Sequence, residues 1–94
     1  MITVEKMQRL HPTAKVEQLK NMQLFLVHYP GLILAVSFNS LIAFFFNGEW
    51  YLSTEKLSKT SSKHCYYLRE IFFITHWFET RKAMLQTLKK ILRL

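Results

Sequence analysis

Glycine and proline are scarce in this sequence of 94 residues, which contains only Gly31, Gly48, Pro12 and Pro30. Two isolated glycines exclude glycine-rich loops that bind phosphates or dinucleotides, because such loops need several glycines at close spacing. Low-complexity linkers and internal repeats are also absent. The length corresponds to one domain, because 94 residues are too few for two independent cores.

Cysteine occurs once, at Cys65, so an internal disulfide is impossible and a reduced, cytoplasmic protein is expected. The N-terminus mixes charges and lacks an early apolar run, which is not the pattern of a signal peptide. The six acidic residues are scattered and form no general acid–base pair. A single cysteine among separate histidines does not match the spacing of zinc ligands. We therefore expect no catalytic residues, no metal and no cofactor.

Positive charge is unevenly distributed. The net charge is +7, and residues 55–94 alone carry nine basic side chains against three acidic ones. This asymmetry is typical of proteins that bind polyanions, either nucleic acid or an anionic surface.

The middle of the sequence has no formal charge between residues 21 and 48, and its length would permit a membrane-spanning helix over residues 22–46. Polar and turn-forming residues interrupt this run at 28–31 and at 37–40. Asn47-Gly48 then closes it with a strong hairpin signal. The interruptions favour strands over a membrane-spanning helix, which remains the alternative.

Four short runs rich in strand-forming residues are separated by turn signals. They are Met22–Tyr29, Leu32–Phe38, Leu41–Phe46 and Glu49–Ser53. This order predicts an antiparallel β-meander over about residues 22–54, preceded by an N-terminal arm at 1–20. Several runs are apolar on both faces, so helices or a second chain must cover both sides of the sheet. The predicted fold class is α+β.

One or two helices are expected in the basic region 60–94. Hydroxyl side chains precede a periodic segment, and we place the N-cap at Thr60 or Ser61 with a helix continuing to Phe78. The alternative is a strand across Tyr66–Trp77, because that stretch is rich in strand formers. Thr80–Leu94 has an apolar stripe and five positive charges without an acid, which predicts a basic amphipathic helix.

The segment Ser58–His64 combines hydroxyls, two lysines and a histidine at a predicted helix N-terminus, where free amides and the helix dipole favour an anion. An ordinary helix cap, with His64 holding the helix to the sheet, is the alternative. The candidate anion-binding or nucleic-acid-binding residues are Ser58, Lys59, Thr60, Ser62, Lys63, His64, Arg69, Arg81, Lys82, Lys89, Lys90 and Arg93.

Two stretches, Ser37–Ala43 (S-F-N-S-L-I-A) and Ser58–His64 (S-K-T-S-S-K-H), resemble a two-part signature. It is close to S-Y-x-T-P-V-A followed by S-x-T-T-S-x-H, in a family of small phage and archaeal proteins known as a domain of unknown function. The similarity covers about residues 32–68. Phe38 and Leu41 replace the tyrosine and proline of the signature. The resemblance implies a β-meander leading into a helix, a phage or mobile-element origin, and no assigned activity.

Three functional hypotheses follow. The first is a non-enzymatic binding module, a phage or mobile-element accessory protein that binds nucleic acid or a host nucleic-acid-handling complex through its basic helical half. The second is an anti-defence inhibitor that contacts a host protein directly. The third is a small membrane protein with residues 22–46 inserted. In the first two cases a homodimer is expected, because the apolar surface exceeds what 94 residues can bury.

Overall fold

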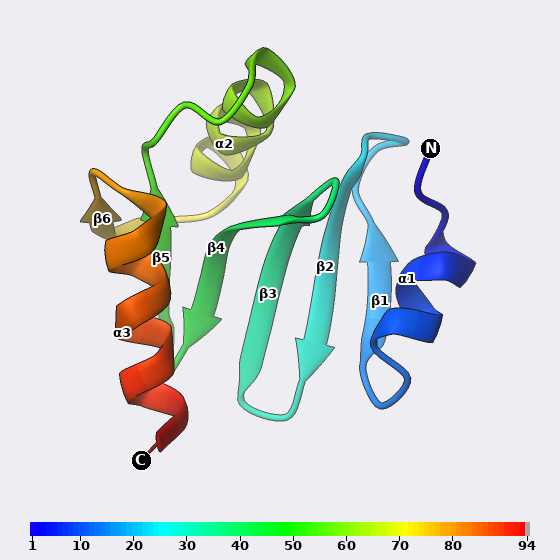
Figure 1. Cartoon of the computed structure of the whole chain (residues 1–94), viewed down its shortest axis with the longest axis horizontal. Coiled ribbons are helices and arrows are strands. Elements are labelled where there is room, and N and C mark those ends of the chain that lie inside the picture. Colours follow the sequence, from blue (N-terminus) through cyan, green and yellow to red (C-terminus); the bar gives the residue numbers. More distant parts are fainter. Residues whose placement is uncertain (94) are drawn as a thin grey trace.

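Within residues 1–93, one six-stranded sheet carries three helices (Figure 1). The computed structural model describes residues 1–93. The elements are, in chain order, α1 (Val4–Leu10), β1 (Lys15–Gln18), β2 (Leu24–Tyr29), β3 (Leu32–Ser37), β4 (Ser40–Phe46), β5 (Glu49–Ser53), α2 (Lys59–Ile71), β6 (Ile74–Phe78) and α3 (Arg81–Arg93). The expected α+β class, with a meander followed by helices, is confirmed.

The strands lie side by side in chain order, from β1 to β6. The first five pair antiparallel, whereas β6 pairs parallel to β5 after the crossover through α2. Tight turns join the hairpins, and backbone in the left-handed region occurs at Gly31, Phe38, Asn47 and Gly48. The parallel β5–α2–β6 unit brings the carboxyl ends of two strands to the same edge of the sheet.

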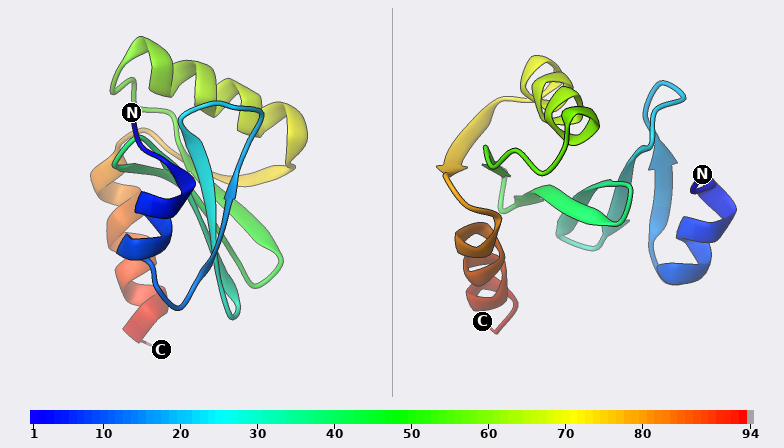
Figure 2. Two further views of the ribbon diagram at one scale, coloured as in Figure 1. Left: turned by 90° about the vertical axis from the view of Figure 1, so that its right-hand side faces the viewer. Right: turned by 45° about the horizontal axis from the view of Figure 1, so that its top comes forward.

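Helices cover both faces of the sheet, as the apolar runs required (Figure 2). Helix α2 packs on one face through Leu68, against a cluster that includes Trp50 and Leu52. Helices α1 and α3 share the opposite face, where Met7 and Met84 are their buried anchors. The central strands are therefore buried on both sides, which explains their almost continuous apolar sequence.

Residues 22–46 form the hairpins of β2, β3 and β4 and not one helix. Within residues 1–93, no helix has both the length and the apolar character that a bilayer crossing requires.

The predicted helix boundaries in the basic half need correction. Helix α2 is capped by Ser58, two or three residues earlier than expected, and its hydroxyl accepts the amide hydrogen of Ser61. The prediction of a helix as far as Phe78 is wrong, because α2 ends at Ile71 and β6 follows. The strand alternative is correct for the last part of Tyr66–Trp77 only.

The predictions for the N-terminal arm and for the last helix differ in accuracy. The expected N-terminal arm contains α1 and β1, which the sequence did not reveal. The basic helix predicted over Thr80–Leu94 is present as α3, with Thr80 preceding it. Leu94 lies outside the described residues.

The turn at Gly48 gives a direct test of the meander. Its φ is +79°, and a Cβ there would meet no atom within 4 Å. Gly48→Ala should therefore lower the free energy of unfolding by about 1 kcal/mol through backbone strain alone. Gly48→Asn should lower the free energy of unfolding less, because asparagine tolerates a left-handed backbone. Urea denaturation measures both, and an alanine variant as stable as the parent would contradict the assigned turn.

Candidate functional site

A buried polar network joins the stretches Ser37–Ala43 and Ser58–His64. The Ser37 hydroxyl and His64 Nδ1 are hydrogen bonded at 2.6 Å, although 27 positions separate them in the chain. The Ser58 hydroxyl donates to Ser61 Oγ at 3.1 Å, and Ser61 Oγ lies 3.4 Å from Ser37 Oγ. The end of β3 is thus tied to the first turns of α2.

The histidine of this network faces the protein interior. His64 is 4% exposed, and the ring of Phe38 stacks on it with centroids 6.2 Å apart. Burial lowers the pKa of His64 below its usual value of 6.5, because desolvation disfavours the imidazolium. In this position a neutral His64 holds α2 to the β3–β4 hairpin.

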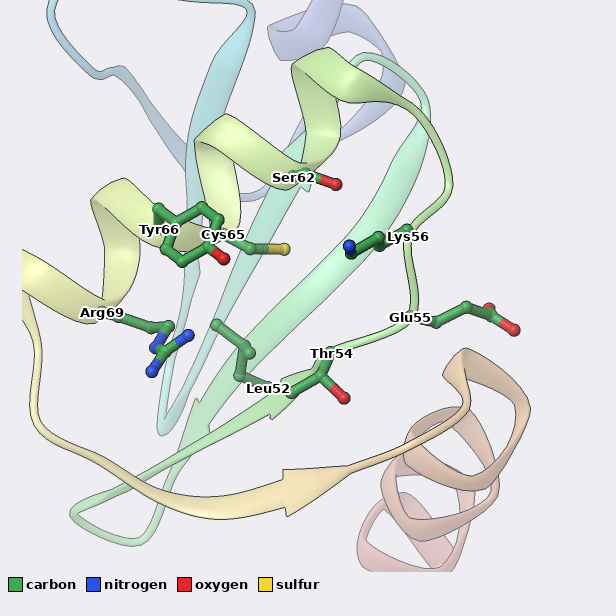
Figure 3. A pocket seen from close by; sticks show the side chains of 8 residues that line it. All are labelled: Leu52, Thr54, Glu55, Lys56, Ser62, Cys65, Tyr66 and Arg69. Atoms are coloured by element: carbon green, nitrogen blue, oxygen red, sulfur yellow. The ribbon is translucent and has the colours of Figure 1, made fainter.

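A cavity of about 220 Å³ opens between α2 and the chain segment after β5 (Figure 3). One face of α2 forms one wall, and the end of β5 with residues 54–56 forms the other. Its lining residues are Leu52, Thr54, Glu55, Lys56, Ser62, Cys65, Tyr66 and Arg69. The hydroxyl and amide of Thr54 both donate to the Phe78 carbonyl, which ties this segment to β6.

Exposed aromatic rings flank a guanidinium at the mouth of the cavity. Arg69 lies 5.4 Å from the ring centroid of Tyr66 and 4.9 Å from that of Trp77. Tyr66 and Trp77 are 60% and 48% exposed, so each ring presents a free surface. Phe73, in the turn between α2 and β6, is 86% exposed. We call Tyr66, Arg69, Phe73 and Trp77 the aromatic surface.

The charges around the cavity are mostly positive. Lys56 points across the opening toward the side of α2 that carries Ser62 and Cys65, whereas Glu55 points away toward α3 (Figure 3). Burial raises the pKa of the Cys65 thiol, and the nearby Arg69 opposes that rise. The thiol therefore stays protonated at neutral pH and donates weakly to the Ser53 carbonyl, at 3.8 Å.

The predicted site residues fall into separate groups. Lys59, Thr60 and Lys63 are exposed on the first turns of α2, while Ser58 caps the helix and His64 is buried. Ser62 and Arg69 line the cavity.

On α3, the predicted residues divide again. Arg81 is half-buried: its Nε donates to the Leu41 carbonyl and its amide to Glu55. The exposed basic residues of α3 are Lys82, Lys89, Lys90 and Arg93.

Lys56 and Glu55 were missing from the predicted site. Both lie in an irregular segment without a motif, and only the parallel crossover places them opposite α2. A prediction of β6 as a strand parallel to β5 would have indicated this site, because ligands bind at the carboxyl ends of parallel strands. Within residues 1–93, no group of three metal-ligating side chains comes together.

Comparison with known protein families, curated proteins and solved structures gives no match for this chain.

Proposed function

We propose that this protein is a non-enzymatic binding module for single-stranded nucleic acid, and that the cavity and the aromatic surface form its contact region. The observation that carries the proposal is Arg69 held between the exposed rings of Tyr66 and Trp77, with Lys56 across the same cavity (Figure 3). Exposed rings offer stacking platforms to unpaired bases, and the cations meet the phosphates between them. The signature resemblance supports a role as a phage or mobile-element accessory protein.

Single strands fit this surface better than a duplex does. Bases stacked and paired inside a duplex do not offer their faces to Tyr66 and Trp77. The raised pKa of Cys65 and the burial of His64 also leave the contact region without an activated nucleophile or general base. Binding without chemistry is the function that this combination supports best.

The test is fluorescence anisotropy with labelled decathymidylate and decauridylate, with a duplex of equal length as the comparison. Wild-type affinity for the single strands should exceed that for the duplex. It should fall about fifty-fold between 50 and 200 mM salt if four phosphates are contacted. Salt-independent binding, or preference for the duplex, would overturn the proposal.

Variants of Tyr66 distinguish base stacking from nonspecific binding. Tyr66→Ala should weaken binding about tenfold or more, because a stacked base contributes about 1–3 kcal/mol. Tyr66→Phe keeps the ring and should stay within about twofold of wild type. Equal losses in the two variants would count against stacking.

Arg69 offers a second matched pair. Arg69→Gln should weaken binding about tenfold and reduce the salt dependence, since it removes one phosphate contact. Arg9→Gln removes the same charge from α1, at the opposite edge of the sheet, and should change affinity little. If both variants lose the same affinity, only net charge matters and the site is wrong.

A protein partner is the second candidate, and Phe73 is the observation that favours it. This ring is 86% exposed and has no polar group, and aromatic residues with arginine are typical of binding hot spots. A direct inhibitor of a host protein would use this surface in the same way. Capture of one host protein from nuclease-treated lysate, lost on Phe73→Ala, together with no oligonucleotide binding, would favour this candidate.

A further inference from the structure

The outer face of α3 carries a row of four polar side chains, three of which are positively charged. Lys82, Gln86, Lys89 and Arg93 follow one another at spacings of four, three and four residues, which places them along one side of the helix. All four are exposed, and α3 contains no acidic residue between 81 and 93. At 1.5 Å per residue, the row is about 16 Å long.

Such a row is unfavourable for the helix itself. Lys89 and Arg93 are four residues apart, where like charges repel each other and weaken a helix. An ordinary surface helix mixes charges of both signs. A polyanion lying along the row would relieve this repulsion, because each cation would face a phosphate.

The row also adjoins the cavity. A second hollow, lined by Glu55, Arg81, Lys82, Leu85, Gln86 and Lys89, lies beside α3. Glu55 lines both hollows, and its carboxylate accepts the Arg81 amide hydrogen at 3.3 Å. The two surfaces therefore meet around the segment after β5, although α2 and α3 cover opposite faces of the sheet (Figures 2 and 3).

Glu55 is the one acidic side chain among the described residues that line the two hollows. Its charge stands between Lys56 and Arg69 on one side and Lys82 and Lys89 on the other. A phosphate that passes from one hollow to the other would be repelled here, so Glu55 should oppose binding of a strand that occupies both.

We infer that one single strand occupies both surfaces, with its bases stacked at the aromatic surface and its backbone continuing past Glu55 along α3. This inference rests on the proposed function and adds the path of the strand and a minimum ligand length. A trinucleotide fills only the cavity and the aromatic surface. A strand of about ten nucleotides, within the usual size of such sites, also reaches Arg93.

The experiment compares two ligand lengths on three proteins. Trithymidylate is titrated by NMR and decathymidylate by fluorescence anisotropy, at the same salt concentration. The α3 variant combines Lys82→Gln, Lys89→Gln and Arg93→Gln. The control combines Lys6→Gln, Arg9→Gln and Lys15→Gln, three exposed cations on α1 and β1. Circular dichroism verifies that each protein is folded.

The α3 variant should bind decathymidylate about thirty-fold more weakly than wild type and trithymidylate within about twofold. The affinity of the control for either ligand should fall by less than about threefold. Equal losses in the two triple variants, or no gain in wild-type affinity from three to ten nucleotides, would overturn the path while leaving the proposed function intact. Failure of wild type to bind trithymidylate at Tyr66 and Trp77 would overturn both.

Glu55→Gln gives the result that a purely structural role would not produce. The amide still accepts a hydrogen bond from Arg81 but carries no charge, so affinity for decathymidylate should rise about threefold. Affinity for trithymidylate should change less. Weaker binding of decathymidylate by Glu55→Gln would contradict the path.

Discussion

Replacing Phe44 with alanine is expected to lower the free energy of unfolding by about 4 kcal/mol. The ring is completely buried in β4 and stacks on Tyr51 with centroids 4.6 Å apart. It also contacts the cluster through which Met84 and Leu88 attach α3 to the sheet. Alanine would leave a cavity at the centre of that attachment, and the rigid strands on both sides of β4 would limit any collapse.

Phe73→Ala is the matched control, because the same atoms are removed from a ring that is 86% exposed. Its free energy of unfolding should change by less than about 0.5 kcal/mol. Urea denaturation followed by circular dichroism measures both variants. The free energy of unfolding of a small protein is about 5–15 kcal/mol in total, so the loss in Phe44→Ala would be easily measured. Equal stability of the two variants would contradict the position of α3 on the sheet.

The meander was predictable because its signals are local. Pro30-Gly31 and Asn47-Gly48 lie at turns, and both glycines have the positive φ that these turns require. The turn between β3 and β4 is less obvious, because Phe38 takes the left-handed backbone that glycine or asparagine would favour. The end of β3 and the start of β4 therefore each differ by one residue from the limits expected.

The end of α2 was not predictable from the absence of breakers. No glycine or proline follows Gly48, yet the helix stops at Ile71. The following residues are aromatic or β-branched, and β5 offers Ile74 a strand edge to pair with. Tertiary pairing decided between helix and strand here, and sequence periodicity does not report on such pairing.

The candidate site could be predicted only in part for the same reason. The charge distribution pointed to the basic half of the sequence. Lys56 and Arg69 line one cavity, and the contact of Arg69 with Trp77 depends on β6 returning parallel to β5. The predicted polar cluster at Ser58–His64 divides: His64 is buried and bonds Ser37, whereas Lys59, Thr60 and Lys63 are exposed.

Protein stability should fall as the pH drops below 6.5, and His64 is the reason. Burial lowers the pKa of His64 in the folded protein, whereas the unfolded chain keeps the ordinary value of about 6.5. Between the lowered pKa and 6.5 the unfolded state binds more protons, so protonation favours unfolding. The contribution of neutral His64 is therefore complete above pH 6.5 and is lost as the pH falls toward the lowered pKa.

His64→Ala should lower the free energy of unfolding at pH 7.5 by about 3 kcal/mol, because it leaves a cavity and removes the partner of the buried Ser37 hydroxyl. His64→Gln keeps a neutral polar side chain that does not titrate, so its stability should change less than that of wild type between pH 7.5 and 5. Urea denaturation at several pH values gives both quantities. The same loss of stability on acidification in wild type and His64→Gln would assign the pH dependence to other groups. Because Ser37 ends β3 and His64 lies in α2, a large effect would show that their hydrogen bond joins the sheet to this helix.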